Sequence, residues 1–515
     1  MGKFALLRTG ILVIFLVACG VGKVNETATP TPLPATPVSS STSTHAPLPT
    51  LTASLSPTAV APLSQTGPWL LLRSDYGMWV INSDGTGLTQ IANYDTDPAY
   101  QGWLSLAIAP HGGRLAYFYP SQEPGILVEA PPELMLITLP SVSPKPLTPL
   151  HSRVSSPTTT PDEVDPNGDV WAVLTWGNNL AWSPDGSMLA FVGAPDGPTS
   201  DLYVYSTRSG TIKRLTSGPT QAIYPSWSPD GRYILSAAAR TMNFGVGGSN
   251  GPEVDKVWAV RPDGSDLRVV QTFPNNNQET PALGSIEWVN NQAYIESFGM
   301  LGCGAFGLTF VDFLTPHQYT LLPGPFSSAA LAPGAGILLI AIPDKSKDYE
   351  YMSALCGPSP QPGWYLMSVY GNKSPQRISL DVPASPDTND KILTWSPQAK
   401  VFFASISEHL YAVDLKGKVT AIDVPNDSYD ASPVVSPNGQ DWAIPAYEQG
   451  LWITSLASPA RQVFIGPVTD ALWTPDGAAL LFTSDDVLYR AAAPDYQPVA
   501  LANIPESGLE GWMMP

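Results

Sequence analysis

The sequence predicts an all-β fold made of many short strands, and two observations carry that prediction. Proline and glycine account for 55 and 43 of the 515 residues, about a fifth of the chain, which is typical of strands joined by frequent tight turns. A turn motif, Ser/Thr-Pro-Asp-Gly, recurs after Trp with an apolar run on each side. Aromatic residues make up 10% of the chain, which is enough to build an extended core.

Charge and composition exclude several classes of function. The net charge of −19, from 25 basic and 44 acidic residues, argues against binding to a phosphate backbone, so we expect no nucleic-acid partner. Three Cys exclude a disulfide-dense scaffold, and the five His show no spacing typical of zinc ligands. We therefore expect no resident cofactor, with calcium as the one ion considered below.

The first twenty residues predict export and lipidation. Lys3 and Arg8 precede an apolar run, Thr9–Ala18, of the length typical of a signal peptide, whereas about 20 apolar residues are needed to span a bilayer. The run ends in Leu-Val-Ala-Cys19-Gly, which resembles the bacterial lipobox. That resemblance implies cleavage after residue 18, acylation of Cys19, and an extracytoplasmic protein held on a membrane by lipid. An ordinary cleaved signal and an uncleaved anchor are the alternatives.

Residues 19–66 form the predicted tether and residues 67–515 the predicted folded domain. The stretch from Val24 to Gln65 is rich in Thr, Pro and Ser and has almost no large apolar side chain to bury, so we expect a disordered, extended stalk. O-glycosylation of the stalk and a bare spacer both remain open.

The repeated motif predicts a hairpin in each repeat. Full copies begin at Trp182, Trp227 and Trp473; weaker copies surround Pro110, Trp288, Pro333, Trp395 and Pro437. In the motif, Pro fixes the φ angle of the first turn residue, the Asp side chain forms a hydrogen bond back to the backbone, and Gly adopts a positive φ. Each motif is followed by a third apolar run and a short fourth one, such as Asp201–Tyr205 and Lys213–Thr216.

A four-stranded antiparallel unit repeated along the chain is the blade of a β-propeller. Eight motif copies, and further strands from Trp69 onward, predict one ring of eight or nine blades. The repeats resemble the TolB-type, WD-like propeller family over Trp69–Pro515. Because this family ranges from translocation proteins to propeller domains of peptidases, the resemblance implies the fold and not the function. The recurring Trp residues are expected to pack between blades.

We expect the C-terminus to close the ring. The chain enters the domain at Trp69 with what reads as a second strand, so the first blade lacks its inner strand. The last eight residues, Gly508–Pro515, contain Trp512 where other blades carry the Trp of the motif. They are predicted to supply the missing strand and remove the free sheet edge.

Four insertions are predicted to open on one face of the ring. Ser121–Pro132, Ala239–Asp255 and Pro343–Gly363 fall between second and third strands, and His151–Asn179 joins a fourth strand to the next blade. Long loops on one face of a repeat scaffold commonly form its binding surface. Their aromatic residues are the candidate ligand contacts: Phe244, Tyr349, Tyr351 and Trp364.

Two further sites are suggested within these insertions. The side chains of Glu163, Asp165, Asn167 and Asp169 resemble the front half of a calcium loop, but Leu174 stands where a bidentate Glu is required, so a solvated acidic loop is favoured. Cys303 and Cys356 fall on the same face in consecutive blades. Because lipid would consume Cys19, we expect them to form a disulfide, with two free thiols as the alternative.

These features favour a binding or interaction module that binds a protein, peptide or glycan partner on its insertion-bearing face. A hydrolase or lyase with a site in the central funnel is one alternative. A structural component of the cell envelope is the other.

Overall fold

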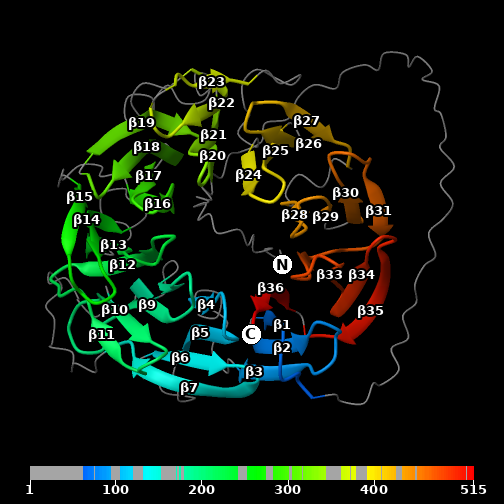
Figure 1. Cartoon of the computed structure of the whole chain (residues 1–515), viewed down its shortest axis with the longest axis horizontal. Helices are drawn as coiled ribbons and strands as arrows, with labels where there is room; N and C mark the ends of the chain where they lie inside the picture. Colours follow the sequence, from blue (N-terminus) through cyan, green and yellow to red (C-terminus); the bar gives the residue numbers. More distant parts are fainter. Residues whose placement is uncertain are drawn as a thin grey trace, which may run out of the picture.

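The computed structural model describes residues 62–515 except for 75, 94–104, 120–131, 152–169, 171–172, 175–178, 242–251, 274–281, 301–303, 316, 344–360, 372, 379–390, 407–408, 425–431, 447–448 and 506. Within this part of the chain, nine antiparallel sheets of four strands follow one another around a ring (Figure 1). The predicted all-β propeller is confirmed, and its blades number nine.

The first four blades take up the N-terminal half. Blade 1 contains β1 (Trp69–Ser74), β2 (Gly77–Asn82), β3 (Thr89–Asn93) and, from the C-terminus, β36 (Gly508–Met513). Blade 2 contains β4 (Leu106–Ile108), β5 (Arg114–Tyr119), β6 (Glu133–Thr138) and β7 (Ser141–Pro149). Blade 3 contains β8 (Leu180–Trp182), β9 (Met188–Gly193), β10 (Asp201–Ser206) and β11 (Ile212–Arg214). Blade 4 contains β12 (Gln221–Trp227), β13 (Ile234–Thr241), β14 (Glu253–Val260) and β15 (Arg268–Thr272).

Five blades complete the ring. Blade 5 contains β16 (Ala282–Trp288), β17 (Ala293–Met300), β18 (Gly304–Asp312) and β19 (His317–Phe326). Blade 6 contains β20 (Ser328–Ala332), β21 (Ile337–Ile342), β22 (Gly363–Ser368) and β23 (Gln376–Arg377). Blade 7 contains β24 (Lys391–Ser396), β25 (Val401–Ile406), β26 (His409–Asp414) and β27 (Val419–Ile422). Blade 8 contains β28 (Val434–Val435), β29 (Trp442–Ala446), β30 (Gly450–Thr454) and β31 (Arg461–Phe464). Blade 9 contains β32 (Asp470–Trp473), β33 (Ala479–Ser484), β34 (Val487–Ala492) and β35 (Gln497–Asn503).

The C-terminal strand closes the ring as the sequence predicts. β36 pairs with β1 in the antiparallel sense, from Trp69 opposite Met513 to Arg73 opposite Gly508. Figure 1 shows β36 beside β1, so the two ends of the propeller meet in one sheet. Met513 is fully buried and Leu509 is nearly so. The final segment is therefore an integral strand of blade 1 and leaves β1 without a free edge.

Tryptophans of the innermost strands link one blade to the next. The indole Nε1 of Trp182, Trp227, Trp473 and Trp512 donates to a backbone carbonyl oxygen of the preceding inner strand, at 2.7–3.0 Å: Ala107, Ala181, Val434 and Trp473, respectively. In blade 5, Trp288 donates instead to the Ser226 hydroxyl at 2.9 Å. Trp395 packs on Phe402 within the core between blades 6 and 7. The predicted role of these residues in blade packing is confirmed.

The hydrophobic core lies between neighbouring blades. The cluster that joins blades 8 and 9, for example, includes Ala443, Leu451, Trp473, Leu480 and Phe482, all buried. A sheet such as that of blade 7 is apolar on both faces because one face packs on the preceding blade and the other on the following blade. Burial at about 25 cal/mol per Å² of apolar surface makes these contacts the main source of stability.

The antiparallel order gives the ring two distinct ends. Turns from the first to the second strand, and from the third to the fourth, lie at one end, which we call the turn face. The chain passes from second to third strands, and from one blade to the next, at the other end, which we call the insertion face. The insertions at 121–132 and 343–363, and the linker at 151–179, leave from strand ends on the insertion face, as predicted.

One predicted boundary is wrong. β13 continues to Thr241 and β14 begins at Glu253, so both strands extend into the segment expected to be a loop from Ala239 to Asp255. Pairing continues because Ala239 lies opposite Val254 and Thr241 opposite Glu253 across two β-bulges. The strands on each side of this insertion are therefore longer than the sequence pattern suggests.

Candidate functional site

Most of the residues singled out by sequence fall outside the described part of the chain. These are Cys19, Phe244, Cys303, Tyr349, Tyr351, Cys356 and the acidic group Glu163, Asp165, Asn167 and Asp169. Lipidation, the disulfide, the loop contacts and calcium binding therefore stay predictions. Among the residues that the structure does describe, no group of three His, Cys, Asp or Glu side chains is placed to hold a metal ion. No described helix has the length and apolar character needed to cross a membrane.

Trp364 is not an exposed ligand contact, and this prediction is corrected. It belongs to β22, pairs with Ala341 and is 2% exposed within the core between blades 6 and 7. The strand begins at Gly363, directly after the insertion, so the aromatic residue that reads as the end of a loop is the start of a buried strand.

Ion pairs join strand ends at the insertion face in blades 3 and 4. Arg240, at the end of β13, contacts Asp255 at 3.0 Å and Glu253 at 3.6 Å across the base of its insertion. In blade 3, Asp201 is 1% exposed and binds Arg214. Burial raises the pKa of Asp201 even though Arg214 and Thr216 bond to it. The Arg240 pairs hold the two strand ends from which one insertion leaves, and the Asp201–Arg214 pair joins two strand ends of blade 3 on the same face.

The motif turns on the turn face share one hydrogen-bond pattern. In blade 3 the Ser183 hydroxyl bonds Asp185 at 2.6 Å, and the Ser187 amide donates to the same carboxylate at 3.0 Å. Gly186 takes a φ of +67°, which a residue with a side chain adopts at a cost. The bond from Ser183 holds the pKa of Asp185 below its usual range. Blades 4, 8 and 9 repeat this pattern, with Asn438 replacing Asp in blade 8.

Blade 5 departs from this pattern at its first turn. Asn290 replaces the motif, and its Oδ1 accepts hydrogen bonds from the amides of Gln292 at 2.9 Å and Ala293 at 3.0 Å. At the neighbouring turn of the same blade, Asp312 Oδ1 accepts from the amides of Leu314 and Thr315 at 3.0 and 3.1 Å. Each turn is thus closed by the Oδ1 atom of one side chain. Nδ2 of Asn290 and Oδ2 of Asp312 take no part in these turn hydrogen bonds.

A pocket of about 240 Å³ lies between these turns and blade 6. Its walls come from Asn290, Gln292, Ala293, Phe310, Asp312, His317, Tyr319 and Tyr370. Phe310 stacks on Tyr319 with ring centroids 5.1 Å apart, and Tyr370 meets Phe310 edge-on at 6.1 Å. The pocket is on the turn face because all the turns that build it are first-to-second or third-to-fourth turns.

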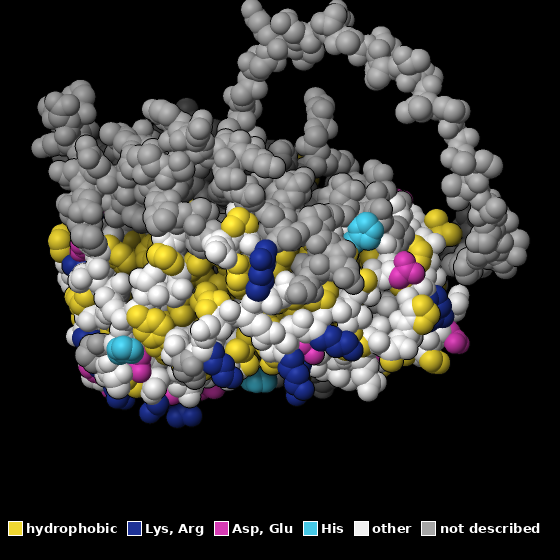
Figure 2. All heavy atoms as spheres, turned by 90° about the horizontal axis from the view of Figure 1, so that it is seen from above, with side chains coloured by type: hydrophobic (Ala, Val, Ile, Leu, Met, Phe, Trp, Pro, Cys, Tyr) yellow, Lys and Arg dark blue, Asp and Glu magenta, His cyan; other side chains and the backbone are white. Residues whose placement is uncertain are grey.

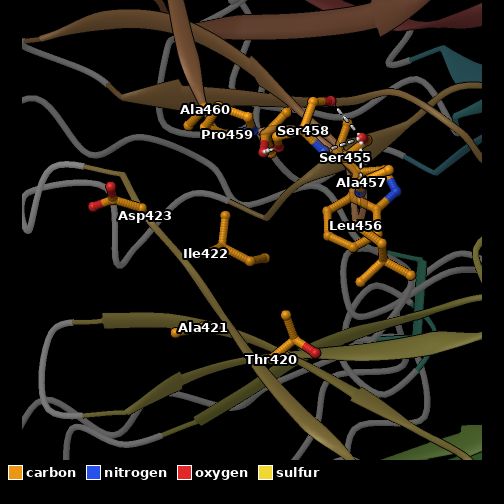
Figure 3. A pocket seen from close by; sticks show the side chains of 12 residues that line it. Thr420, Ala421, Ile422, Asp423, Ser455, Leu456, Ala457, Ser458, Pro459 and Ala460 are labelled. Atoms are coloured by element: carbon orange, nitrogen blue, oxygen red, sulfur yellow. Dashed lines mark hydrogen bonds between the residues drawn. The ribbon is translucent and has the colours of Figure 1, made fainter.

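A second pocket, of about 270 Å³, lies between blades 7 and 8 (Figure 3). Thr420 to Asp423 of β27 and its continuation line one side, and the turn 455–460 lines the other. Two of its hydroxyls, Ser455 and Ser458, bond each other at 2.6 Å. Apart from Asp423, the remaining lining is largely small or apolar, so this pocket offers fewer groups for recognition than the one between blades 5 and 6.

A buried carboxylic acid also distinguishes blade 5. Glu296 in β17 is fully buried beside Tyr294, and neither carboxylate oxygen has a hydrogen bond of good geometry to any residue that the structure describes. Burial raises the pKa of Glu296 to about 8, although Tyr294 and Gln271 lie near enough to oppose the shift. Glu296 is therefore largely protonated at neutral pH. Glu287 of β16 also has a raised pKa because of burial.

Sequence reasoning missed both features of blade 5. The pocket is assembled from turns of two blades, so no single motif reveals it. One signal was available: the motif copy at Trp288 is the most degenerate, and this is the blade where the polar groups gather.

Figure 2 shows how the basic side chains are distributed on the surface: Lys and Arg lie mainly along the lower edge of the ring in that view.

The curated proteins that this chain resembles match it over short stretches of sequence only. A stretch of 68 residues is 43% identical to the uncharacterized peptidase YuxL of Bacillus subtilis (strain 168), covering 13% of this chain and 10% of that protein. A stretch of 86 residues is 35% identical to the uncharacterized protein Atu1656 of Agrobacterium fabrum (strain C58), covering 17% and 25%. The chain thus spans a tenth and a quarter of these relatives' lengths. No family model matches the chain.

Solved structures with a similar arrangement have low sequence identity. An oligogalacturonate lyase in complex with manganese is 13% identical with a TM-score of 0.35, and the match covers 63% of this chain and 88% of the other. A eukaryotic initiation factor is 14% identical with a TM-score of 0.47, covering 87% and 98%. At these values the matches carry no argument about function.

Proposed function

We propose that this chain is a lipid-anchored, extracytoplasmic binding module that holds a protein, peptide or glycan partner on the insertion face of its propeller. The observation that carries the proposal is the asymmetry of the ring. All four insertions leave from one end, and the ion pairs of Arg240 with Asp255 and of Arg214 with Asp201 hold strand ends there. A rigid scaffold with long connections on one face is the usual design of a binding surface.

The anchoring half of the proposal rests on the N-terminal sequence. A short apolar core followed by Ala-Cys-Gly is suited to lipoprotein processing, and acyl chains contribute about 0.8 kcal/mol per buried CH₂. The full chain, expressed in a bacterium that processes lipoproteins, is expected in the detergent phase. The Cys19→Ser chain is expected in the aqueous phase, and equal retention of both would refute the anchor.

The binding half is tested by exchanging one insertion. Residues 242–251, between the ends of β13 and β14, are replaced by a short Gly-Asn turn, and the full chain is cross-linked in cells. Loss of a cross-linked partner, with the partner retained when exposed Arg232 on the turn face is changed to Ala, supports the insertion face. An unchanged cross-linking pattern with the exchanged loop would contradict it.

An enzyme is the alternative that one comparison favours, because the relative from Bacillus subtilis is named a peptidase. The match covers a tenth of that protein, so the activity in its name is a hypothesis here. A serine-hydrolase probe that labels the full chain would support the enzyme, and absence of labelling together with partner capture would support the binding module. A purely structural envelope role predicts neither result.

A further inference from the structure

We propose that the pocket between blades 5 and 6 binds a single neutral sugar residue, as part of a glycan. The pocket is on the turn face, at the opposite end of the ring from the partner surface proposed above. It therefore constitutes a second site, whose existence does not depend on that partner.

The aromatic wall of the pocket is fixed by contacts behind it. The Tyr319 hydroxyl donates to the carbonyl oxygen of Val369, and its ring stacks on buried Phe310. Tyr370 lies directly on the backbone of Gly336, where an added Cβ would come within 2.4 Å of the ring. Gly336 has a φ of +61°, which also favours glycine. Tyr370 nevertheless remains 44% exposed, so a fixed aromatic surface is open to a ligand.

The polar groups around this wall provide both donors and acceptors. Asn290 and Asp312 are oriented by the turns that they close through Oδ1, and Nδ2 of Asn290 and Oδ2 of Asp312 are not used in those bonds. Gln292 and His317 are exposed at the rim. The two side-chain amides and the imidazole can donate to and accept from sugar hydroxyl groups, and the carboxylate of Asp312 can accept from them.

Size and charge select the ligand class. Pockets for drug-sized ligands have volumes of about 300–1,000 Å³, so 240 Å³ suits a smaller group such as one sugar ring. A sugar needs one apolar surface for its C–H groups and planar polar side chains for its hydroxyls, which this pocket combines. A cation would need several ring faces around it. Here Phe310 covers part of Tyr319, Tyr370 is edge-on to Phe310, and Asp312 is the single carboxylate.

The experiment uses the full chain and named probes. The methyl glycosides of glucose, galactose, mannose and N-acetylglucosamine are tested by saturation-transfer NMR and then titrated. Tetramethylammonium and an acetylated lysine ester serve as cationic probes. The variants are Tyr370→Ala and Gln292→Ala, both at exposed positions, and Tyr76→Ala is the matched control because Tyr76 is 64% exposed in blade 1, away from the pocket.

We expect at least one glycoside to bind, with affinity reduced about tenfold or more in Tyr370→Ala and unchanged in Tyr76→Ala. The proposal would be overturned by saturation transfer to none of the glycosides, by binding of the cationic probes alone, or by equal binding of the glycoside to Tyr370→Ala and the parent chain. Loss of the insertion-face partner leaves glycoside binding unaffected. Failure of the proposed function and failure of this site are therefore distinguishable.

Discussion

Blades 9 and 5 share one topology but differ at equivalent positions. In blade 9 the first turn is closed by a bond from Thr474 to Asp476, whereas in blade 5 it is closed by Asn290 alone. Trp473 of blade 9 lies opposite Leu480, and Trp288 of blade 5 lies opposite Tyr294. Two residues further along each pair of strands, buried Phe482 in blade 9 corresponds to buried Glu296 in blade 5.

The difference shows what the repeat motif secures. Blades 3 and 9, which keep the motif, have buried Phe191 and Phe482 at this position, and blade 4, which also keeps it, has a small buried residue, Ser236. Blade 5 loses the motif, gains a carboxylic acid at a core position and presents a pocket on the turn face. The regular blades thus supply stability, and the irregular blade supplies the groups that a ligand or a change of pH can act on.

The largest expected effect comes from removing the strand that closes the ring beside blade 9. Deletion of Gly508–Pro515 exposes the edge of β1 and removes the buried side chains of Leu509 and Met513, worth about 2–5 kcal/mol each. We expect a loss of more than about 5 kcal/mol and formation of oligomers, measured by denaturant unfolding and size-exclusion chromatography. Removal of Pro515 alone is the control. A deleted chain that stays monomeric and melts like the parent would refute the closure.

Blade 5 should give the next largest effect, through pH. The pKa of Glu296 is raised by burial to about 8, so the folded state holds a proton that the unfolded state loses above about pH 4.5. Stability is therefore fully present at low pH and falls as the pH rises toward 8, with a slope of up to about 1.4 kcal/mol per pH unit. Glu296→Gln should be more stable at pH 8 and have a flatter profile.

The control for this experiment is Glu133→Gln, a half-buried residue at the start of β6. Its pH profile of unfolding should follow that of the parent chain. Glu287 shifts in the same direction as Glu296, so the profile of Glu296→Gln is expected to be flatter but not flat. If Glu296→Gln and the parent lost stability equally between pH 5 and 8, the buried acid would not be the cause.

An intermediate effect is expected from the links between blades. Trp473→Phe removes the bond to Val434 O and leaves that oxygen without its donor, at a cost of about 1–3 kcal/mol beyond the lost volume. Trp364→Phe is the matched control, because Trp364 is about as buried as Trp473 but its Nε1 has no hydrogen-bond partner among the described residues. Thermal unfolding of both variants checks this, and equal losses would show that the indole bond is unimportant.

The smallest effect should come from the turns. Asp476→Asn is expected to change stability by less than about 0.5 kcal/mol at pH 7, because Asn438 makes the same bonds in blade 8, whereas Asp476→Ala should cost about 1 kcal/mol. The bond from Thr474 lowers the pKa of Asp476, so its contribution is present above the unfolded pKa of about 3.9 and is lost as the pH falls. Acid unfolding should therefore begin at a higher pH in the parent than in Asp476→Asn.

Local patterns in the sequence were sufficient for the fold. The motif at Trp182, Trp227 and Trp473 predicts the hairpins because each is specified by residues adjacent in the chain. The ring closure was predictable because Trp512 repeats that motif at the other end of the chain. The number of blades stayed open between eight and nine, since the strands from Trp69 onward add a ninth set to the eight motif copies and propellers usually have at most eight blades.

The candidate site was less predictable because it depends on contacts between blades. Tyr370 and Asn290 come from different blades and meet only in the folded ring. Trp364 was misjudged because its strand begins directly after a long insertion. Glu296 could have been identified by aligning the repeats, since Phe191 and Phe482 occupy the same register position and a charged residue there is anomalous.

The way the ring closes also determines how the molecule carries mechanical load. β1 is flanked by β2 on one side and β36 on the other, so it is an internal strand of its sheet. Just before it, Ser64 donates to Asn82, Asn82 donates to Pro62 O, and Trp69 donates to Ser64 O, fastening the entering chain to blade 1. When the chain is held at Ser507, next to the Gly508 end of β36, a pull on the N-terminal segment meets this fastening first and then loads the β1–β36 ladder in shear, because Trp69 lies at the other end of that ladder, opposite Met513. Shear breaks many hydrogen bonds together and not one at a time. Single-molecule stretching between residues 62 and 507 should show one high-force event, and a gradual low-force peeling would contradict it.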